Sequence, residues 1–594
     1  MTHRGPDAEG YFVHGHVALG HRRLKIVDLE GGKQPLFNED ESVVVVFNGE
    51  IFNFQQIKTE LESRGHRFRT HSDTEVIVHA YEEYGDACPT YFRGMFAFAV
   101  YDLARDRLLL ARDRLGIKPL YYHFDGERLL FASEVRPILH ALRGKPSVEA
   151  GLIDFYVSLG YVPGEHTLFK GIHRLLPGHT LVRERGRHSV RPYWDITSIP
   201  MLDISFDEAK ERLEQLLSES VRLRLMSDVP LGAFLSGGLD SSSVVAYMSR
   251  MMSEPVKTFS VGYRDDPESS ELEYARVVAK AFGTEHREFI LESGDFFESL
   301  QLLLDHSEEP IVESAAVALY QLSKLAREHV TVILSGEGGD EILAGYPLYQ
   351  IMPKVDRLHA LTRLLPRALL RGIGERAIGS EKALKYWDWI GTPLGRRYWG
   401  ISNDVTASLK KRMYSAEFQA NVGSMVGDYF EKMFGALEEG SDLRRMSYVD
   451  LKTWLPDDLL LKADKMTMAC SLELRVPMLD HHLLEFATAL PDHLRLNGAQ
   501  GKYLLKKVME RHLPHEIIYR KKKGFPVPIA VWFRGPLYER VRDILLDPRS
   551  LSRGYFRPEY IRRVLERHRA GSEDLSRRIF SLLTLELWHR KYVD

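Results

Sequence analysis

One glycine-rich loop, residues 236–242, constrains the fold of this chain most strongly. It follows an apolar run, 229–235, that predicts a buried strand, and it precedes a run, 243–248, that predicts a helix. A strand, a tight glycine turn and a helix start together gather backbone N–H groups that bind an anion such as phosphate. Asp240 would repel a bare anion, but its carboxylate is explained when a magnesium ion lies between it and the phosphates. The loop therefore predicts a nucleotide site that uses Mg²⁺.

The segment around this loop, from Asp207 onward, alternates between predicted helices and strands. Helical spacing of apolar residues comes first, and after the loop the pattern predicts strand 256–261, helix 271–282, strand 286–291 and strand 330–334. Such alternation predicts a parallel, doubly wound sheet. The last strand ends on a second glycine-rich acidic loop, 335–341, and the remainder to Asp594 reads as mostly helical. Because ligands of such sheets bind at the carboxyl ends of the strands, we expect both loops to form one site.

The first part of the chain is rich in β-strand patterns instead. Strands are predicted at 42–47, 95–101, 107–111, 121–123 and 129–132, with helices starting at Asn53 and Asp73. Strands around two helices predict a sandwich with the helices outside. A short polar stretch after Asp195 reads as a linker, so we expect two domains, 1–195 and 205–594.

Composition narrows the class of protein. The net charge of −3 over 594 residues gives no reason to expect nucleic acid or an anionic membrane as a partner. No apolar run reaches the length that spans a bilayer, and the first residues do not form a signal peptide. Only Cys88 and Cys470 are present, which excludes a disulfide framework and a CxxC metal pattern. We therefore expect a protein of the reducing cytoplasm, with both cysteines as packed structural thiols.

The two glycine-rich acidic loops, taken with the β-rich first part, carry a family resemblance. The chain resembles the glutamine-dependent asparagine synthetase family over essentially its whole length. The first part looks like the family's glutaminase domain of the N-terminal-nucleophile type, and the second part looks like its ATP-pyrophosphatase synthetase domain. Besides the two loops, the segments that support the resemblance are 3–7, 20–28, 47–53, 72–75, 96–98, 111–120, 462–466 and 472–480.

In the first part the resemblance implies a glutamine site. Arg23 matches the arginine that pairs with the α-carboxylate, a role that suits a planar bidentate donor. Asp73 matches the aspartate that takes the α-ammonium, and Glu50 lies beside it. Asn48 and Gly49 match the oxyanion-hole donors. The implied glutamine-binding residues are Arg23, Val27, Asn48, Gly49, Glu50 and Asp73.

In the second part the resemblance implies a site for ATP and Mg²⁺. Leu235 and Val261 match positions that frame the adenine and ribose. The implied contacts to the phosphates and nucleotide are Ser236, Gly237, Gly238, Asp240, Ser241, Ser242, Ser335 and Gly336. Asp240 and Asp340 match the carboxylates that hold Mg²⁺.

Two further residues match catalytic positions of the synthetase half. Glu337 matches a residue tied to formation of the acyl-adenylate. Lys522, within the basic run 520–523, matches a lysine that stabilises negative charge in the transition state. By contrast, we expect Arg112 and Arg114 to brace the glutaminase fold, and the His14–His16 and His481–His482 pairs to be surface or packing residues without a metal.

The implied reaction is an amide synthesis driven by ATP. Aspartate attacks the α-phosphorus to give acyl-AMP and pyrophosphate, glutamine is hydrolysed in the other domain, and its ammonia displaces AMP. Two alternatives stay open at this point. The acceptor is another carboxylate, such as a polysaccharide sugar acid or the precursor of a lactam ring, or the chain is a non-catalytic glutamine-binding subunit. The oligomeric state also stays open, a homodimer included.

The sequence departs from the family at the glutaminase nucleophile, a cysteine at the mature N-terminus. Position 2 is Thr2, and the segment 3–7 that follows is one that family members reach well inside the chain. Either an internal Met has been taken as the start of a longer product, or the protein begins here and uses ammonia only. We expect the first, because a domain without selection for glutamine need not keep Arg23, Asn48 and Asp73.

Overall fold

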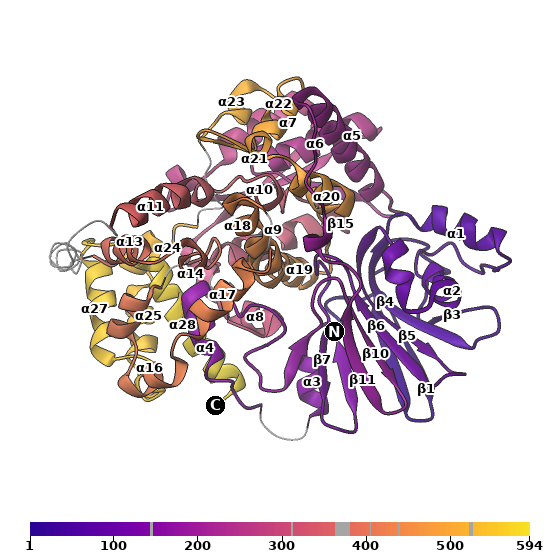
Figure 1. The fold of residues 1–594 in the computed structure, drawn as a ribbon, viewed down its shortest axis with the longest axis horizontal. Coiled ribbons are helices and arrows are strands. Elements are labelled where there is room, and N and C mark those ends of the chain that lie inside the picture. Colours follow the sequence, from indigo (N-terminus) through magenta and orange to yellow (C-terminus); the bar gives the residue numbers. More distant parts are fainter. Residues whose placement is uncertain (143–145, 311–312, 363–379, 404, 438–439, 522–526) are drawn as a thin grey trace.

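The computed structural model describes all residues of the chain except 143–145, 311–312, 363–379, 404, 438–439 and 522–526. A strand-rich N-terminal part lies beside a second part that holds a five-stranded sheet and most of the helices (Figure 1). None of the helices in this described portion combines the length and apolar character needed to cross a bilayer.

The largest sheet of the N-terminal part has six strands in the order β11-β10-β6-β5-β4-β3, and every pair of neighbours is antiparallel. Its strands are β3 (Leu36–Phe37), β4 (Val43–Ile51), β5 (Gly94–Asp102), β6 (Arg107–Arg112), β10 (His179–Glu184) and β11 (Arg187–Pro192). Side chains of β4 alternate between two cores, because successive residues of a strand face opposite ways. Val43 and Val45 pack with helices α1 (Phe54–Ser63) and α2 (Glu75–Tyr84), whereas Val44 and Val46 pack on the other face.

A second layer of strands covers that other face. It contains the pair β1 (Ala8–His14) and β2 (Val17–Arg23) and the sheet β8-β7-β9, made of β7 (Tyr121–Phe124), β8 (Leu129–Ala132) and β9 (Ile172–Arg174). Leu19 and Tyr122 from this layer share a core with β4 and β5. The predicted sandwich with outer helices is thereby confirmed, and burial on both faces explains why β4 reads as a continuous apolar run.

Neither Asn53 nor Asp73, the residues predicted to start α1 and α2, caps its helix with a side-chain hydrogen bond. Asn53 precedes α1, but its side chain accepts the backbone N–H of Arg93 at 2.8 Å and makes no cap bond to the helix. Asp73 does not cap α2, because its carboxylate accepts the Ile51 N–H at 2.8 Å and Thr74 occupies the N-cap position. Both side chains therefore fasten a helix start to a neighbouring segment of the sandwich.

The second part is built on a five-stranded parallel sheet in the order β14-β13-β12-β15-β16. The strands are β12 (Leu231–Phe234), β13 (Lys257–Tyr263), β14 (Glu285–Leu291), β15 (Val332–Leu334) and β16 (Glu473–Arg475). Four of them, with helices α5 (Phe206–Arg224), α6 (Leu239–Met251) and α7 (Leu272–Phe282), confirm the predicted doubly wound order. The prediction of a mostly helical remainder is confirmed, but β16 was not foreseen, because this three-residue strand has charged residues at both ends and no β-branched residue.

The helices that complete the fold surround this sheet. Those before it or within it are α3 (Val135–Ala141), α4 (Leu152–Leu159), α8 (Ser293–Ser307), α9 (Ala315–Arg327) and α10 (Gly339–Ile342). The following ones are α11 (Leu348–Thr362), α13 (Glu381–Gly391), α14 (Leu394–Arg397), α15 (Ala407–Met413), α16 (Ala416–Val422), α17 (Met425–Phe434), α18 (Asp442–Lys452) and α19 (Leu461–Met468). The last are α20 (His481–Ala489), α21 (Asp492–Arg495), α22 (Tyr503–Met509), α23 (His515–Ile518), α24 (Ile529–Arg534), α25 (Tyr538–Leu545), α26 (Pro548–Leu551), α27 (Pro558–Arg569) and α28 (Ser576–Tyr592), with the hairpin β17 (Leu496–Asn497) and β18 (Gln500–Gly501) before α22.

Buried charged contacts join the two parts. Arg93 of the N-terminal part donates to the Asp480 carboxylate at 2.8 Å, and Lys118 lies 3.4 Å from the Asp464 carboxylate of α19. Arg475 of β16 lies 3.3 Å from the Glu50 carboxylate at the end of β4. One apolar cluster also runs from the N-terminal part into the C-terminal helices. The part with the predicted glutamine site and the part with the predicted nucleotide site therefore pack directly against each other.

Candidate active sites

The six residues predicted to bind glutamine line one cavity of about 280 Å³ in the N-terminal part. They come from the end of β2, the segment after it, the end of β4 and the segment before α2. These residues are Arg23, Val27, Asn48, Gly49, Glu50 and Asp73. The His21 ring of β2 bonds to the Phe47 carbonyl of β4, and Asp73 accepts the Ile51 N–H of β4, so both neighbouring segments are fastened to this strand.

The Arg23 side chain is held by backbone carbonyls. Its guanidinium donates to the carbonyl oxygens of Val27 at 2.9 Å, Asp28 at 2.7 Å and Leu29 at 3.3 Å. Gly32 lies beside it, and a Cβ there would lie 2.3 Å from the guanidinium, so a side chain at this position would displace Arg23. These three bonds use both N–H groups of Nη2 and one of Nη1, which leaves the Nε N–H and one Nη1 N–H of the five donors. The cavity thus presents an oriented cation.

Two buried carboxylates face the same cavity. Burial raises the pKa of Asp73 to about 7. Burial, followed by the neighbouring carboxylates of Asp73 and Glu473, raises the pKa of Glu50 well above its usual value. Arg475 offsets part of this repulsion from 3.3 Å. A second cation, such as the α-ammonium of an amino acid, would favour the charged form of both acids.

Backbone geometry at Gly49 restricts that position to glycine. Its φ of +144° is rare for residues with a side chain, and a Cβ there would lie 2.0 Å from the carbonyl oxygen of Met95. The neighbouring Asn48 amide reaches the Ser133 hydroxyl at 3.5 Å. Asn48 and Gly49 thus line the cavity near the end of β4, and their role as oxyanion donors stays a prediction.

The two glycine-rich loops meet at the carboxyl edge of the parallel sheet. They follow β12 and β15, which are neighbours in the sheet and lie where the strand order changes direction, the usual ligand site of such folds. A Cβ on Gly336 would lie 2.6 Å from the backbone nitrogen of Ser241, so the loops touch. The loop before α6 is tightened by a 3.0 Å contact between the Ser236 and Ser241 hydroxyls, and Gly237 has a φ of +66°.

The remaining predicted nucleotide residues lie around this edge. Leu235 follows β12 and Val261 lies on β13, and both are buried. Gly238 is the N-cap of α6, and Ser242 is fully buried in its first turn. Ser335 directly follows β15. The structure thus brings the predicted residues of both loops to one edge of the sheet.

A lysine that sequence reasoning missed lies between the two aspartates. The Lys502 ammonium bonds to Asp240 and lies 2.7 Å from the Asp340 carboxylate. Although burial disfavours its charge, these two acids raise the pKa of Lys502 above its usual value. Lys502 has a φ of 54° and precedes α22. Its sequence neighbourhood has no motif of its own, so only the tertiary contact identifies it.

Glu337 lies next to this group of charges. Burial raises its pKa, as do the Asp340 and Asp240 carboxylates, whereas the Lys462 ammonium of α19 opposes the rise. Glu337 therefore shares one electrostatic environment with both aspartates. Lys522 lies outside the described residues, although Arg520, two positions earlier, contacts Glu271 at 2.6 Å.

The residues expected to play structural roles do so. Arg112 donates to the backbone oxygens of Lys118 and Gly116 within its own domain, and Arg114 donates to Phe92. Burial raises the pKa of the Cys88 thiol well above its usual value and that of Cys470 to about 12. Both thiols are thereby kept in the unreactive, protonated form.

This fold and these two sites define a class of ligase that joins a glutamine amidotransferase domain to a nucleotide-binding α/β domain. The chain belongs to the asparagine synthase family: the family model described as asparagine synthase matches residues 212–590, and the one described as glutamine amidotransferase domain matches residues 1–194. Members of this family are ATP-dependent.

Individual relatives cover nearly all of the chain. It is 36% identical to the glutamine-hydrolyzing asparagine synthetase 1 of Bacillus subtilis, over 99% of this chain and 92% of that protein. It is 30% identical to asparagine synthetase 3 of the same organism, over 89% and 82% of the two chains. It is also 28% identical to a protein named amidase chyE of Penicillium rubens, over 93% and 87%.

Proposed function

We propose that this protein makes asparagine from aspartate, with ATP as the energy source and glutamine or free ammonia as the nitrogen donor. The observation that carries the proposal is the meeting of the two acidic loops at the sheet edge, where Asp240 and Asp340 bond to one ammonium beside Glu337. The glutamine-like cavity in the same packed body supports it, as does the similarity to the two Bacillus subtilis asparagine synthetases.

In the synthetase half, the N–H groups of the loop before α6 would hold the pyrophosphate of ATP. Asp240 and Asp340 would hold Mg²⁺, which suits their hard carboxylate oxygens and would neutralise charge on the departing pyrophosphate. The aspartate side chain attacks the α-phosphorus, and the bond to the pyrophosphate oxygen breaks. Glu337 is proposed to position the reacting groups for this step. Lys522 is proposed to stabilise the negative charge of its transition state.

In the glutaminase half, Arg23 would pair with the α-carboxylate of glutamine through its positive charge and a remaining N–H group. Asp73 and Glu50 would bind the α-ammonium, and Asn48 and Gly49 would donate to the oxygen that gains charge during hydrolysis. Ammonia then attacks the acyl carbon of the aspartyl-adenylate, and AMP leaves with its electron pair. The products are asparagine, AMP and pyrophosphate.

The direct test is release of pyrophosphate from ATP and Mg²⁺ with aspartate, run once with glutamine and once with ammonium chloride. We expect aspartate-dependent pyrophosphate and asparagine in equal amounts. Asp240→Asn should lower the rate at least about 100-fold, because a metal-binding carboxylate supplies several kcal/mol to such a step. Asp428→Asn, which alters an exposed carboxylate paired with Arg396, is the matched control and should be active.

If aspartate does not stimulate the release of pyrophosphate from ATP, the assignment of aspartate as the substrate is wrong. Calorimetric titration with ATP and Mg²⁺ then separates the remaining possibilities, since a non-catalytic subunit would bind no nucleotide in either the wild type or Asp240→Asn. The comparison of the two nitrogen donors reports separately on glutamine hydrolysis.

A second candidate function keeps the chemistry and changes the acceptor. The full-length similarity to a protein named amidase chyE is the observation that favours it, because that protein's name does not specify aspartate. Screening other carboxylic acids in the pyrophosphate assay distinguishes the two candidates: the acid that gives a stoichiometric amide product is the acceptor.

We also propose the domain division 1–195 and 205–594. Strand β11 ends at Pro192, α5 begins at Phe206, and only a three-residue 3₁₀ turn, Ile196–Ser198, is formed between them. The family matches end at 194 and begin at 212, which is consistent with this division. Both cysteines are free, which fits a reducing compartment such as the cytoplasm.

A further inference from the structure

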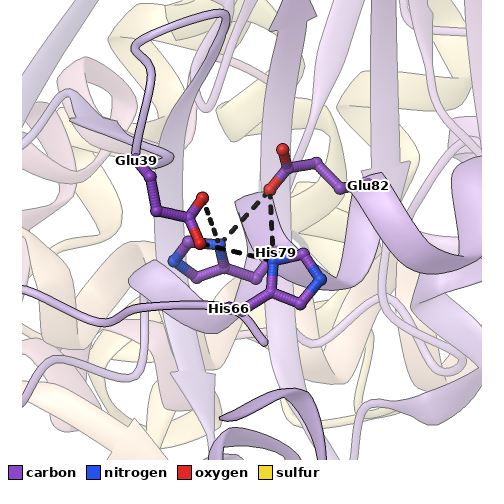
Figure 2. A group of neighbouring side chains, drawn as sticks. All are labelled: Glu39, His66, His79 and Glu82. Carbon is purple, nitrogen blue, oxygen red and sulfur yellow. Dashed lines mark hydrogen bonds and ion pairs between the residues drawn. The ribbon is translucent and has the colours of Figure 1, made fainter. Parts of the chain in front are cut away.

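Four side chains with metal-ligand chemistry meet in the N-terminal part at a place that neither candidate active site uses. Glu39 lies between β3 and β4, His66 follows α1, and His79 and Glu82 are three residues apart on α2. Figure 2 shows the two carboxylates facing the two imidazole rings across a small central space. We propose that Glu39, His66, His79 and Glu82 form a structural site for a divalent transition metal ion, with Zn²⁺ as the best match.

The distances among these groups fit a tetrahedral ion. The Nδ1 atom of His66 lies 3.6 Å from a carboxylate oxygen of Glu39 and 3.6 Å from one of Glu82. The Nδ1 atom of His79 lies 3.4 Å and 3.3 Å from oxygens of the same two residues. Zinc bonds to nitrogen and oxygen are about 2.0–2.2 Å, so neighbouring ligand atoms of a tetrahedron lie about 3.3–3.6 Å apart. These nitrogen–oxygen separations lie in the range of ligand–ligand distances around tetrahedral zinc; both histidines face the same oxygen of Glu82, and each faces a different oxygen of Glu39.

The outer nitrogen of each imidazole faces a further carboxylate. The His66 Nε2 atom lies 3.1 Å from Glu83, and the His79 Nε2 atom lies 3.7 Å from Glu75. A carboxylate behind a histidine holds the proton on the outer nitrogen and leaves the inner lone pair for the metal. The hydrogen bond to Glu83 thus favours a free Nδ1 lone pair on His66, while Glu75 lies near the outer nitrogen of His79 without bonding to it.

The two inner carboxylates are held in place by the protein as well. One oxygen of Glu82 accepts the Asn38 amide at 2.7 Å, which leaves its other oxygen directed at both histidines. One oxygen of Glu39 accepts the backbone N–H of Arg67 at 2.7 Å. Such bonds orient ligands before the ion binds, so less conformational freedom is lost on binding.

The site requires positive charge at its centre. His79 is fully buried, with the Phe68 ring centroid 4.4 Å from its own. Carboxylate oxygens of Glu39 and Glu82 lie 3.4 Å and 3.3 Å from its Nδ1 atom, and one of Glu75 lies 3.7 Å from its Nε2 atom, so negative charge surrounds the ring. Either protons on the imidazoles or a metal ion can supply the positive charge. Zinc accepts a set of two imidazoles and two carboxylates. Mg²⁺ and Ca²⁺ prefer oxygen ligands alone, so the two imidazoles disfavour them.

An ion here would join three segments that are distant in the chain. It would tie the β3–β4 turn and the segment after α1 to the middle of α2. The residues just before α2, Asp73 and Thr74, line the glutamine-like cavity. The proposed role is therefore to hold α2 in place behind that cavity, with no part in the chemistry. This role does not depend on which acceptor the synthetase half uses.

The test is metal binding by the full-length chain after treatment with a chelator. Zn²⁺ is titrated by calorimetry in excess Mg²⁺, which occupies oxygen-only sites, and Co²⁺ is titrated by visible absorption. We expect one ion per chain, a tetrahedral Co²⁺ spectrum and an X-ray absorption spectrum of bound zinc with two imidazoles. His66→Gln should weaken binding about 100-fold and Glu83→Gln about tenfold. His16→Gln is the matched control, since His16 also faces a carboxylate, Asp106 at 3.3 Å, but lies outside the four-residue group.

Several outcomes would overturn the proposal. Failure of the wild type to bind Zn²⁺ or Co²⁺ would show that the group is a protonated ion-pair cluster. The same conclusion follows if the X-ray absorption spectrum of bound zinc shows no imidazole ligands. It also follows if the wild type, His66→Gln and Glu82→Gln bind zinc equally well. Circular dichroism checks that each variant is folded, and the absorption spectra of the wild type decide the matter if a variant is not.

Discussion

Replacing Lys502 by methionine tests whether its ammonium neutralises the two aspartates of the nucleotide-like site. Lys502 is 7% exposed, and its ammonium bonds to Asp240 and to Asp340. Methionine keeps an unbranched side chain of similar length but removes the charge, so two carboxylates are left facing each other. We expect the variant to be less stable than the wild type, and the loss to shrink when Mg²⁺ is added.

The size of the effect follows from the burial of the partners. Breaking a fully buried ion pair costs about 3–5 kcal/mol. The side chains of Asp240 and Asp340 remain 16% and 20% exposed, so water relieves part of the repulsion and about 2–4 kcal/mol is expected. The entropy of unfolding is about 2.1 cal/mol/K per residue, so in the proposed domain 205–594 each kcal/mol lowers the thermal midpoint by about 1.2 °C. A measurable fall of about 2–5 °C is therefore expected.

Thermal unfolding followed by circular dichroism, with and without Mg²⁺, is the assay. The wild type should respond weakly to Mg²⁺ alone, because Lys502 already supplies the positive charge. Lys507→Met on the same helix, which removes an exposed partner of Glu510, is the control and should change stability by less than about 0.5 kcal/mol. If Lys502→Met melts like this control and gains nothing from Mg²⁺, the assigned role of Lys502 is refuted.

Two further perturbations test the other parts of the site. Burial raises the pKa of Asp73 to about 7, so the folded state holds a proton that the unfolded state loses near pH 4, and stability should fall as the pH rises from about 4 to about 7. Asp73→Asn should make that slope shallower without abolishing it, because Glu50 also has a raised pKa, and it should weaken glutamine binding. A wild type with no such slope would contradict the burial argument. Gly336→Ala should lower ATP-dependent pyrophosphate release and cost about 1–3 kcal/mol, because its Cβ would lie 2.6 Å from the Ser241 nitrogen. Gly294→Ala, whose Cβ would meet nothing within 4 Å, is the control, and equal behaviour of the two variants would show that the loops do not touch.

Much of the fold was predictable because its signals are local. Three such signals are the β-branched run of β4, the helical spacing of α5 and the strand-loop-helix pattern around Gly237. Each of them involves residues that are close together in the sequence. Such patterns report which backbone conformation is favoured and which face is buried. The three-residue strand β16 gave no such signal, since it forms only by pairing with β15.

Site residues were predictable only where they belong to a recognisable sequence motif. Arg23 and Asp73 were identified by family resemblance, and the structure places both on one cavity. Lys502, Arg475 and the histidine–glutamate cluster were missed. Their partners are far away in the chain: Lys502 is separated from Asp240 by 262 positions, and no spacing rule covers such a distance.

By itself, the sequence determined the two acidic loops, the strands and helices that flank them, and the family to which the chain belongs. These features depend on local backbone preference and on residue identities that a motif preserves. Only the tertiary structure decided which charges share a site, because an ion pair or metal site depends on the distance between side chains rather than on their order. The bonds of Lys502 to both aspartates and the meeting of His66 and His79 are contacts of that kind.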